Sequence, residues 1–229
     1  ESRKAFWIDS VRPVIGLEVS GGADIWHKEA AEVVVEASDG SNGSQIAEII
    51  CKTGEKIVGK SSKGAEKFVI TESSQNGEST TVTIIATDYA GNQTVVTDRV
   101  FVDRDAPKAL IQGVEDYTIT SKPVQVSYLA EEENVIQTVR ANILKEDIDG
   151  KKEETEITEW KTKSRNESGD TKKESVQTLA EDGLYKLRMN VTDMAGNVSH
   201  AERQLIIDKE NPVIAHVDEL DGKYLKKFS

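Results

Sequence analysis

Cysteine is nearly absent from this sequence, which has a single one, Cys51, in 229 residues. One thiol can form no internal disulfide and no thiolate cluster for zinc. Because Cys51 lies in the apolar run AEIICKT, we expect it to be buried and unreactive. Extracellular β-domains of eukaryotes often depend on disulfides, so the absence of disulfides here favours a bacterial exported protein or a cytosolic one.

Positive charge, aromatic residues and long apolar runs are also scarce. The 29 Lys and Arg residues are outnumbered by 41 Asp and Glu residues, which gives a formal net charge of −12. This excess argues against nucleic acid or an anionic membrane as a partner, because like charges repel. No apolar run approaches the roughly 20 residues needed to cross a bilayer, so we expect no membrane span. With 37% hydrophobic and 5% aromatic residues, the composition predicts modest cores under a charged surface.

Motifs of enzyme chemistry are missing as well. The sequence has no HExxH, no G-x-S-x-G, no P-loop and no dinucleotide glycine pattern, and its three histidines are scattered. The segment DIDGKKEE at 147–154 resembles a calcium loop but lacks its third acidic position and terminal Glu, so we interpret it as a turn. A glycosidase needs only two well-placed carboxylates, a pattern that sequence does not define. We nevertheless predict a non-enzymatic protein.

What the sequence does contain is an internal repeat. VTIIATDYAGNQTVV at 82–96 returns as LRMNVTDMAGNVSHA at 187–201. A second motif, Asp-x-x-x-Pro, begins at Asp9, Asp103 and Asp208, and it follows the motif aspartates Asp88 and Asp193 by fifteen residues in both copies. Two markers in fixed register indicate tandem modules. We predict one module at 10–103 and another at 104–208, with 1–9 as the end of a preceding module or linker and 209–229 as the start of a following module.

Within each module, apolar residues alternate with polar ones. Tyr185, Leu187, Met189 and Val191 alternate with polar neighbours, and further strands are predicted at 31–38, 45–52, 66–71, 122–129, 138–146 and 155–162. Alternation over six to eight residues predicts half-buried antiparallel strands. The turn segments SDGSNG, QNG, DIDGK and EDG have the spacing of an all-β sandwich. We interpret the charged segments 131–133 and 145–174 as a solvated edge hairpin and loop.

The repeated Thr-Asp-x-Ala-Gly-Asn motif predicts a corner between two strands. Gly91 and Gly196 can take the positive φ of such a turn, and the Asp and Asn side chains can bond nearby backbone groups. Upstream, DGLY places Tyr185 where a tyrosine corner is expected, with its hydroxyl bonded to backbone. Thr80 holds that place in the first module, so its corner must be held in another way.

These motifs resemble those of the repeated bacterial immunoglobulin-like domains of secreted and cell-surface proteins. The resemblance covers nearly the whole chain and implies an all-β fold of two tandem, seven-stranded immunoglobulin-like sandwiches arranged end to end. It also implies a non-enzymatic stalk, spacer or adhesion segment outside the bacterial cell. Two departures are Thr80 and the first linker, DSVRP, which lacks the acidic third residue of DRDAP and DKENP.

Two other functions fit the same sequence. One is a module that binds carbohydrate or a host protein, and the other is an accessory domain of a large secreted hydrolase. Trp7, Trp26 and Trp160 could stack on a sugar if they were exposed together, but we favour them as core or linker anchors. In the favoured interpretation the chain is a monomer whose partners are neighbouring modules of the same chain.

A calcium ion between the modules is the most specific expectation. In an immunoglobulin-like sandwich, the turn after the sixth strand lies where the chain enters the domain, which brings Asp193 beside Asp103 and Asp105 of the linker. Calcium accepts six to eight such oxygens at about 2.3–2.6 Å, and some domains that this chain resembles hold calcium between modules. The alternative is that each aspartate caps its own turn. The first junction offers only Asp9 and Asp88, so we predict weaker binding or none there.

Overall fold

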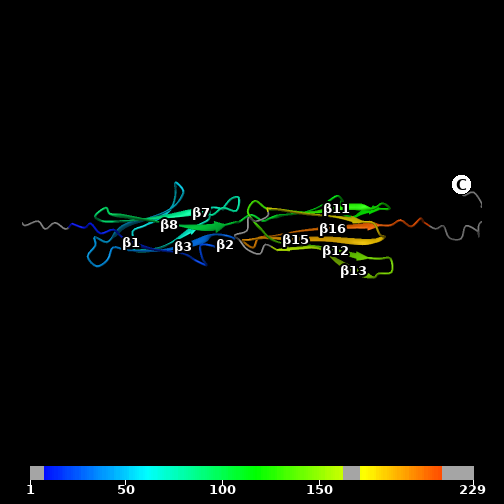
Figure 1. The fold of residues 1–229 in the computed structure, drawn as a ribbon, viewed down its shortest axis with the longest axis horizontal. Helices are drawn as coiled ribbons and strands as arrows, with labels where there is room; N and C mark the ends of the chain where they lie inside the picture. The colour runs from blue at the N-terminus through cyan, green and yellow to red at the C-terminus, as the bar shows by residue number, and fades with distance from the viewer. Residues whose placement is uncertain (1–7, 162–170, 213–229) are drawn as a thin grey trace, which may run out of the picture.

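The computed structural model describes residues 8–161 and 171–212 and shows two all-β sandwiches in line (Figure 1). This confirms the predicted fold class. None of the described residues forms a helix long and apolar enough to cross a membrane. Most of the predicted end segments, 1–9 and 209–229, lies outside the described residues, as does Trp7. The predicted module limit at 103/104 falls between two strands, and the limit at 208/209 follows the last strand of the described residues.

The first sandwich has eight strands in the described part of the chain. Its smaller sheet has the order β1 (Val14–Val19), β3 (Ala31–Ser38), β6 (Ala65–Ile70). Its larger sheet has the order β2 (Trp26–His27), β8 (Gln93–Val102), β7 (Thr80–Asp88), β4 (Ile46–Thr53), β5 (Lys56–Ser61). Neighbouring strands are antiparallel, except that β2 runs parallel to β8.

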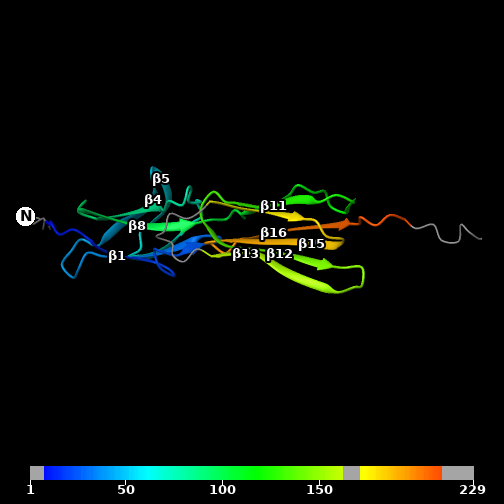
Figure 2. The ribbon, with the colours of Figure 1, turned by 45° about the vertical axis from the view of Figure 1, so that its right-hand side comes forward.

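The second sandwich, which follows the first along the chain in Figure 2, repeats it strand for strand in its sheet orders. Its smaller sheet has the order β9 (Lys108–Gln112), β11 (Val124–Glu131), β14 (Lys172–Leu179). Its larger sheet has the order β10 (Thr118–Thr120), β16 (Val198–Ile207), β15 (Gly183–Asp193), β12 (Ile136–Glu146), β13 (Lys152–Lys161). Again one short strand, β10, pairs in parallel with the last strand, β16. The repeat seen in two short motifs therefore extends to the whole topology.

Each sandwich has one strand more than the resemblance implied, because the opening strand is divided between the two sheets. In the first module, β1 joins the smaller sheet and β2 joins the larger one. The chain crosses between them at Gly21 and Gly22, whose φ angles of 83° and 109° suit glycine alone. In the second module, the crossing between β9 and β10 contains Gly113 and Tyr117, with φ angles of 89° and 61°.

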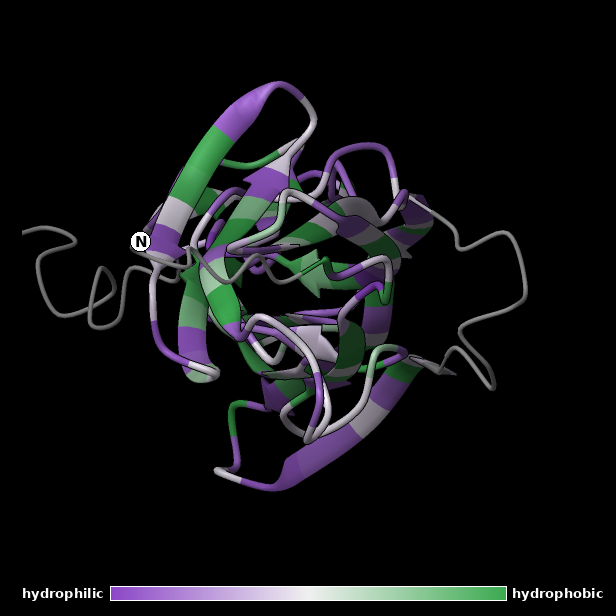
Figure 3. Cartoon of the chain, turned by 90° about the vertical axis from the view of Figure 1, so that its left-hand side faces the viewer, coloured by the Kyte–Doolittle hydropathy of each residue, from purple (hydrophilic) through white to green (hydrophobic). Residues whose placement is uncertain are grey.

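Alternating apolar residues form a separate core in each sandwich. The alternation of hydrophobic and hydrophilic residues along the strands is visible in Figure 3. Cys51 and Leu187 are fully buried, and Tyr185 is buried with its hydroxyl donating to the Glu181 carbonyl oxygen at 2.8 Å. The predicted thiol burial and tyrosine corner are therefore confirmed. The largest fully buried side chains include Ile49, Ile70, Ile84, Tyr128, Ile136, Met189, Leu205 and Ile207.

The charged tract that we interpreted as hairpin and loop is a hairpin in its first part. Strands β12 and β13 form it, and β13 lies at the sheet edge. Its DIDGK turn is closed by the Asp147 carboxylate, which accepts from the backbone N–H groups of Asp149 and Lys151. Residues 172–174 belong to strand β14 and not to a loop, because they pair with β11. Residues 162–170 lie outside the described part.

Candidate cation sites and the module junction

The repeated corner motif ties each module to the linker that enters it. In the second module, the Asn197 backbone N–H donates to Asp193 Oδ1 at 2.9 Å, and Asn197 Nδ2 donates to Asp193 Oδ2 at 2.8 Å. The same Nδ2 donates to the Asp103 carbonyl oxygen at 3.0 Å. Because Asp103 belongs to the linker, this one asparagine joins the corner to the incoming chain.

The first module repeats this set of hydrogen bonds. Asn92 donates from its backbone N–H to Asp88 Oδ1 at 2.8 Å and from Nδ2 to Asp88 Oδ2 at 2.9 Å. Asn92 Nδ2 also donates to the Asp9 carbonyl oxygen at 3.2 Å. Gly91 and Gly196 turn the corners with φ angles of 90° and 86°, as predicted. The motif therefore recurs because both copies fix the entry of the chain in the same way.

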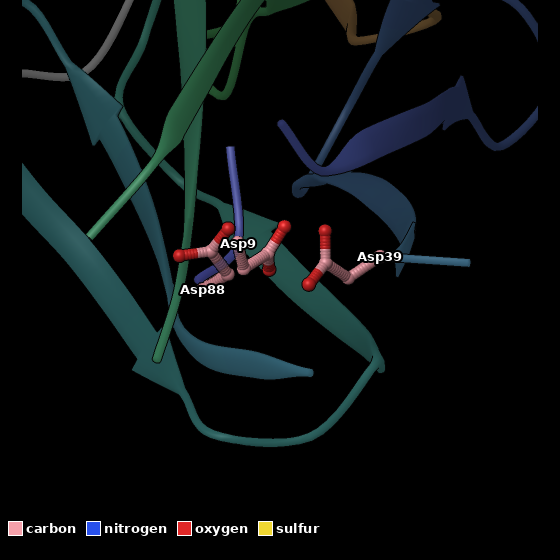
Figure 4. A group of neighbouring side chains, drawn as sticks. All are labelled: Asp9, Asp39 and Asp88. Atoms are coloured by element: carbon pink, nitrogen blue, oxygen red, sulfur yellow. The ribbon is translucent and has the colours of Figure 1, made fainter. Parts of the chain in front are cut away.

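Three acidic side chains meet where the chain enters the first module. One carboxylate oxygen from each of Asp9, Asp39 and Asp88 lies within 4.8 Å of the others. Figure 4 shows these three side chains next to one another. Asp9 lies in the linker, Asp39 follows β3, and Asp88 ends β7. The prediction that this junction offers only Asp9 and Asp88 is therefore wrong. The sequence does not reveal Asp39 because only the sandwich topology brings the end of β3 to the end of β7.

The environment of these acids favours a cation. Asp39 is only 6% exposed; its Oδ2 accepts from the Gln45 N–H at 3.0 Å, whereas its Oδ1 is buried without a hydrogen-bond partner. A buried carboxylate oxygen without a partner is costly unless a cation or donor satisfies it. Asp9 accepts from the N–H groups of Val11 and Ser44, and these bonds hold the pKa of Asp9 below its usual value. Asp9 is therefore ionised at neutral pH and available as a ligand.

At the second junction, Asp103 and Asp193 come together as predicted, and both are buried. Burial raises the pKa of Asp193, the Asn197 hydrogen bonds oppose this rise, and the charge of Asp103 adds to it. Asp105 is exposed, and its backbone N–H donates to Asp103 Oδ1 at 3.1 Å. In the described part of the chain, neither Asp105 nor any other acid joins Asp103 and Asp193 in a group of three within 4.8 Å. The metal role of Asp103, Asp105 and Asp193 stays a prediction.

Glu132 takes the place of a third acid at this junction. It follows β11 directly, as Asp39 follows the equivalent strand β3. Burial raises the pKa of Glu132, and the charges of Asp103 and Asp193 raise it further. Our interpretation of segment 131–133 as solvated is thus wrong for Glu132, which is half-buried. A residue within a charged run can still be drawn inward when the preceding strand ends beside other buried groups.

The junction also contains a small apolar cluster that joins the two modules. Trp26 and Phe101 of the first module pack against Val135 of the second, and all three are less than 10% exposed. The rings of Trp26 and Phe101 lie 4.9 Å apart. Met194 and Ala195, the x-Ala of the corner motif, complete the cluster. Trp26 is therefore an anchor between modules, as we favoured from the sequence.

Trp160 lies elsewhere in the second module. It packs, partly buried, against the core, with the Lys173 ammonium 4.1 Å from its ring centroid. Trp26 and Trp160 thus form no common exposed platform. Trp7 lies outside the described residues.

A polar contact joins the modules beside this cluster. The loop before β7 reaches the second module, where the Gly77 N–H donates to Asn134 Oδ1 at 3.1 Å. Asn134 is buried. The QNG turn marks Gly77 as a loop residue, but no motif marks Asn134 or Val135 in the sequence, so the interface could not be predicted from it.

The comparisons with known proteins agree with this architecture. Residues 131–209 match the sequence profile of a bacterial Ig-like domain. This match falls on the second module and supports the resemblance to bacterial Ig-like domains that the motifs indicated. No curated protein sequence matches the chain.

Several solved structures are similar to the chain. The fibronectin(III)-like modules of Clostridium thermocellum CbhA are 10% identical, with a TM-score of 0.34, 88% of this chain covered and 100% of theirs. Three N-terminal domains of the bacteriophage RB49 Highly Immunogenic Outer Capsid protein are 9% identical, with a TM-score of 0.42 and coverages of 87% and 71%. A tetra-tandem repeat in the extending region of a large adhesion protein is 16% identical, with a TM-score of 0.38 and coverages of 86% and 50%.

Proposed function

We propose that this chain is a non-enzymatic, stiff spacer: a stalk or adhesion segment of a bacterial secreted or cell-surface protein. The observation that carries the proposal is the closed junction between the modules. An apolar cluster, the Gly77–Asn134 hydrogen bond and the Asn197–Asp103 hydrogen bond all hold one module against the next. A chain that served only as a flexible tether would need none of these contacts.

The linker adds to this stiffness. Only three residues separate Asp103 from Pro107, and proline fixes its own φ and restricts the residue before it. The Asp103 N–H donates to the His27 carbonyl oxygen at 2.9 Å, and the Asp103 carbonyl accepts from Asn197. The same residue is thus bonded to both modules, which favours an in-line rod.

Small-angle X-ray scattering of the whole chain tests the spacer. We expect the scattering of a rod of two modules in line. The double variant Trp26→Ala and Val135→Ala should loosen the junction and broaden the distribution of lengths, whereas Val95→Ala, at an exposed position on β8, should not. A wild-type chain whose modules fold back on each other would rule out the spacer.

We propose further that calcium binds at both junctions as the cofactor of this rod. Asp9, Asp39 and Asp88 would form the first site, and Asp103, Asp193 and Glu132 the second, with Asp105 at its exposed side. At the first junction, three carboxylates that converge within 4.8 Å from a linker and two strand ends support the proposal. At the second, the support is the burial of Asp103 and Asp193 and the effect of both charges on Glu132. Calcium suits them because it is a hard cation that accepts many oxygens in flexible geometry.

Calorimetric titration with calcium tests these sites. We expect two binding events in the whole chain. Asp39→Asn should remove or strongly weaken one event and leave the other. Asp149→Asn, in the exposed turn between β12 and β13, is the matched control and should change neither. The calcium sites, though not the spacer, would be ruled out if the wild-type chain took up no calcium at millimolar concentration.

One feature favours the second candidate function, glycan binding. The outer face of the larger sheet of the second module is hollowed beside the bulge between Ala141 and Asn142, and bulges often lie next to functional sites. The hollow is lined by Arg140, Ala141, Asn142, Glu154, Glu156 and Asn190. The amide, carboxylate and guanidinium groups of these residues offer the donors and acceptors that sugar hydroxyls require. A glycan array with the wild-type chain and with Asn190→Ala tests this candidate.

A further inference from the structure

The far end of the second module, here called its tail face, has the same construction as the end of the first module that is covered at the junction. In the first module, β2 pairs in parallel with β8 and sets Trp26 beside Phe101. In the second, β10 pairs in parallel with β16 and sets Ile119 beside Ile206. Two large apolar side chains thus occupy equivalent positions at the tails of both modules.

The chain also leaves both tails along the same path. The Asp103 N–H donates to the His27 carbonyl oxygen, and the Asp208 N–H donates to the Thr120 carbonyl oxygen, both at 2.9 Å. In the following turn, Asp103 Oδ1 accepts from the N–H two residues on at 3.1 Å, and Asp208 Oδ1 does so at 3.0 Å. A module attached after Asp208 would therefore enter over Ile119 and Ile206, as the second module enters over Trp26 and Phe101.

The two tails differ in what covers them. Trp26 and Phe101 are 6% and 8% exposed beneath the second module, whereas Ile119 and Ile206 are 72% and 38% exposed. Ile148, 73% exposed, lines a cavity of about 360 Å³ beside Ile206. Asp182 lines this cavity too, and its Oδ1 is buried without a hydrogen-bond partner. Exposed apolar side chains around a carboxylate oxygen without a hydrogen-bond partner are typical of a surface that another protein surface covers.

We propose that this tail face, formed by Ile119, Ile148 and Ile206, is the docking surface for the entry end of a further module of the same kind. The occupant would present the counterparts of Val135, Met194 and Ala195, which cover the first module's tail. The proposal deepens the spacer function, on which it rests, because it makes the junction a repeating head-to-tail interface.

A three-module chain, with residues 104–208 repeated after Asp208, tests the proposal by thiol labelling. Ile119→Cys and Ile148→Cys, placed singly in the middle module, report the tail face. Cys51 is fully buried and gives no background. Each reporter should react at least about tenfold more slowly than in the two-module chain, because the reagent must wait for the junction to open. Val176→Cys, 49% exposed on β14, should react equally in both chains.

A substitution in the added module identifies the covering surface. Met194→Asp in that copy alone should restore fast labelling, because a charge would be buried against isoleucine. The corner tolerates a different residue there, since Tyr89 takes this place in the first module and is 72% exposed. The proposal is overturned if both reporters label equally fast in the two chains, or if Met194→Asp leaves them shielded. Neither outcome bears on the proposed spacer function, which is tested separately by small-angle X-ray scattering of the two-module chain.

Discussion

Leu187 is one of the fully buried residues in the core of the second module. Its side chain is fully buried at the centre of β15, between β12 and β16. Leu187→Ala would leave a cavity, and we expect the free energy of unfolding of that module to fall by about 2–5 kcal/mol. Urea unfolding measures the loss. Val198→Ala, 58% exposed, is the control and should stay within about 0.5 kcal/mol of wild type. If Leu187→Ala left the free energy of unfolding unchanged, the buried position of Leu187 in this core would be contradicted.

Cys51 makes the first module sensitive to alkali. Burial raises the pKa of its thiol from 9.0 to about 11, so the folded state favours the protonated form. This contribution to stability is fully present below pH 9 and is lost as the pH rises through 11. We expect a loss of up to about 2–3 kcal/mol across that range. Urea unfolding of wild type and Cys51→Ala at pH 8 and pH 10.5 checks it. At pH 8 the variant should be less stable than wild type, but its free energy of unfolding should fall less between pH 8 and pH 10.5. Equal falls in the two chains would contradict a raised pKa of the Cys51 thiol.

Among the structural elements, the corner between the last two strands of a module both turns the chain and bonds to the linker that enters the module. Asn197→Ala removes the two side-chain bonds, to Asp193 Oδ2 and to the Asp103 carbonyl, but keeps the backbone bond to Asp193 Oδ1. A buried acceptor without its donor costs about 1–3 kcal/mol, so we expect the second module to lose that much stability in a urea titration. Asn92→Ala should do the same in the first module. A loss below about 0.5 kcal/mol in both would show that the motif is not what holds the corner.

The elements that sequence could predict are those with a local pattern. Strands β3, β4, β7, β12 and β15 are eight or more residues long and alternate along part or all of their length. A corner needs only glycine and a capping side chain close together. Strands β2 and β10 have two and three residues, too few for any period to show. The first residues of strand β14 are charged and its outward side chains are exposed, so the sequence pattern indicates a loop for this part of the strand.

The candidate cation sites were predictable only in part for a related reason. Asp88, Asp193 and the linker aspartates carry repeated motifs, so their meeting could be inferred from the sandwich topology. Asp39 and Glu132 carry no motif, and one is an aspartate and the other a glutamate. Their equivalence appears only when β3 and β11 are superimposed as the same strand of two modules. The junction cluster around Trp26 is likewise set by packing across modules, which no local pattern encodes.

In the whole molecule, the two sites lie at successive entries along one rod, so calcium should act on its stability. Asp103 and Asp9 belong to linkers, whereas Asp193 and Asp88 belong to corners, so each ion would join a linker to a folded module. Without the ion, three acids lie within 4.8 Å of one another at the first junction, and at the second the buried Asp103 and Asp193 act on each other and on Glu132. Binding to the folded state alone therefore both relieves repulsion and adds linkage energy, about 2.7 kcal/mol at 100 times the dissociation constant.

Thermal melts in millimolar calcium and in chelator measure this effect. We expect calcium to raise the melting temperature by about 10 °C, given the size of the modules. Asp193→Ala serves as the variant, but it also removes the acceptor of the Asn197 bonds and so destabilises the corner without calcium. The informative quantity is therefore the calcium-induced shift of the melting temperature within each chain. In Asp193→Ala this shift should become smaller for the second module and should stay the same for the first module. Asp149→Ala should keep both shifts. If wild type melts at the same temperature in calcium and in chelator, the acids at the junctions are turn caps and nothing more.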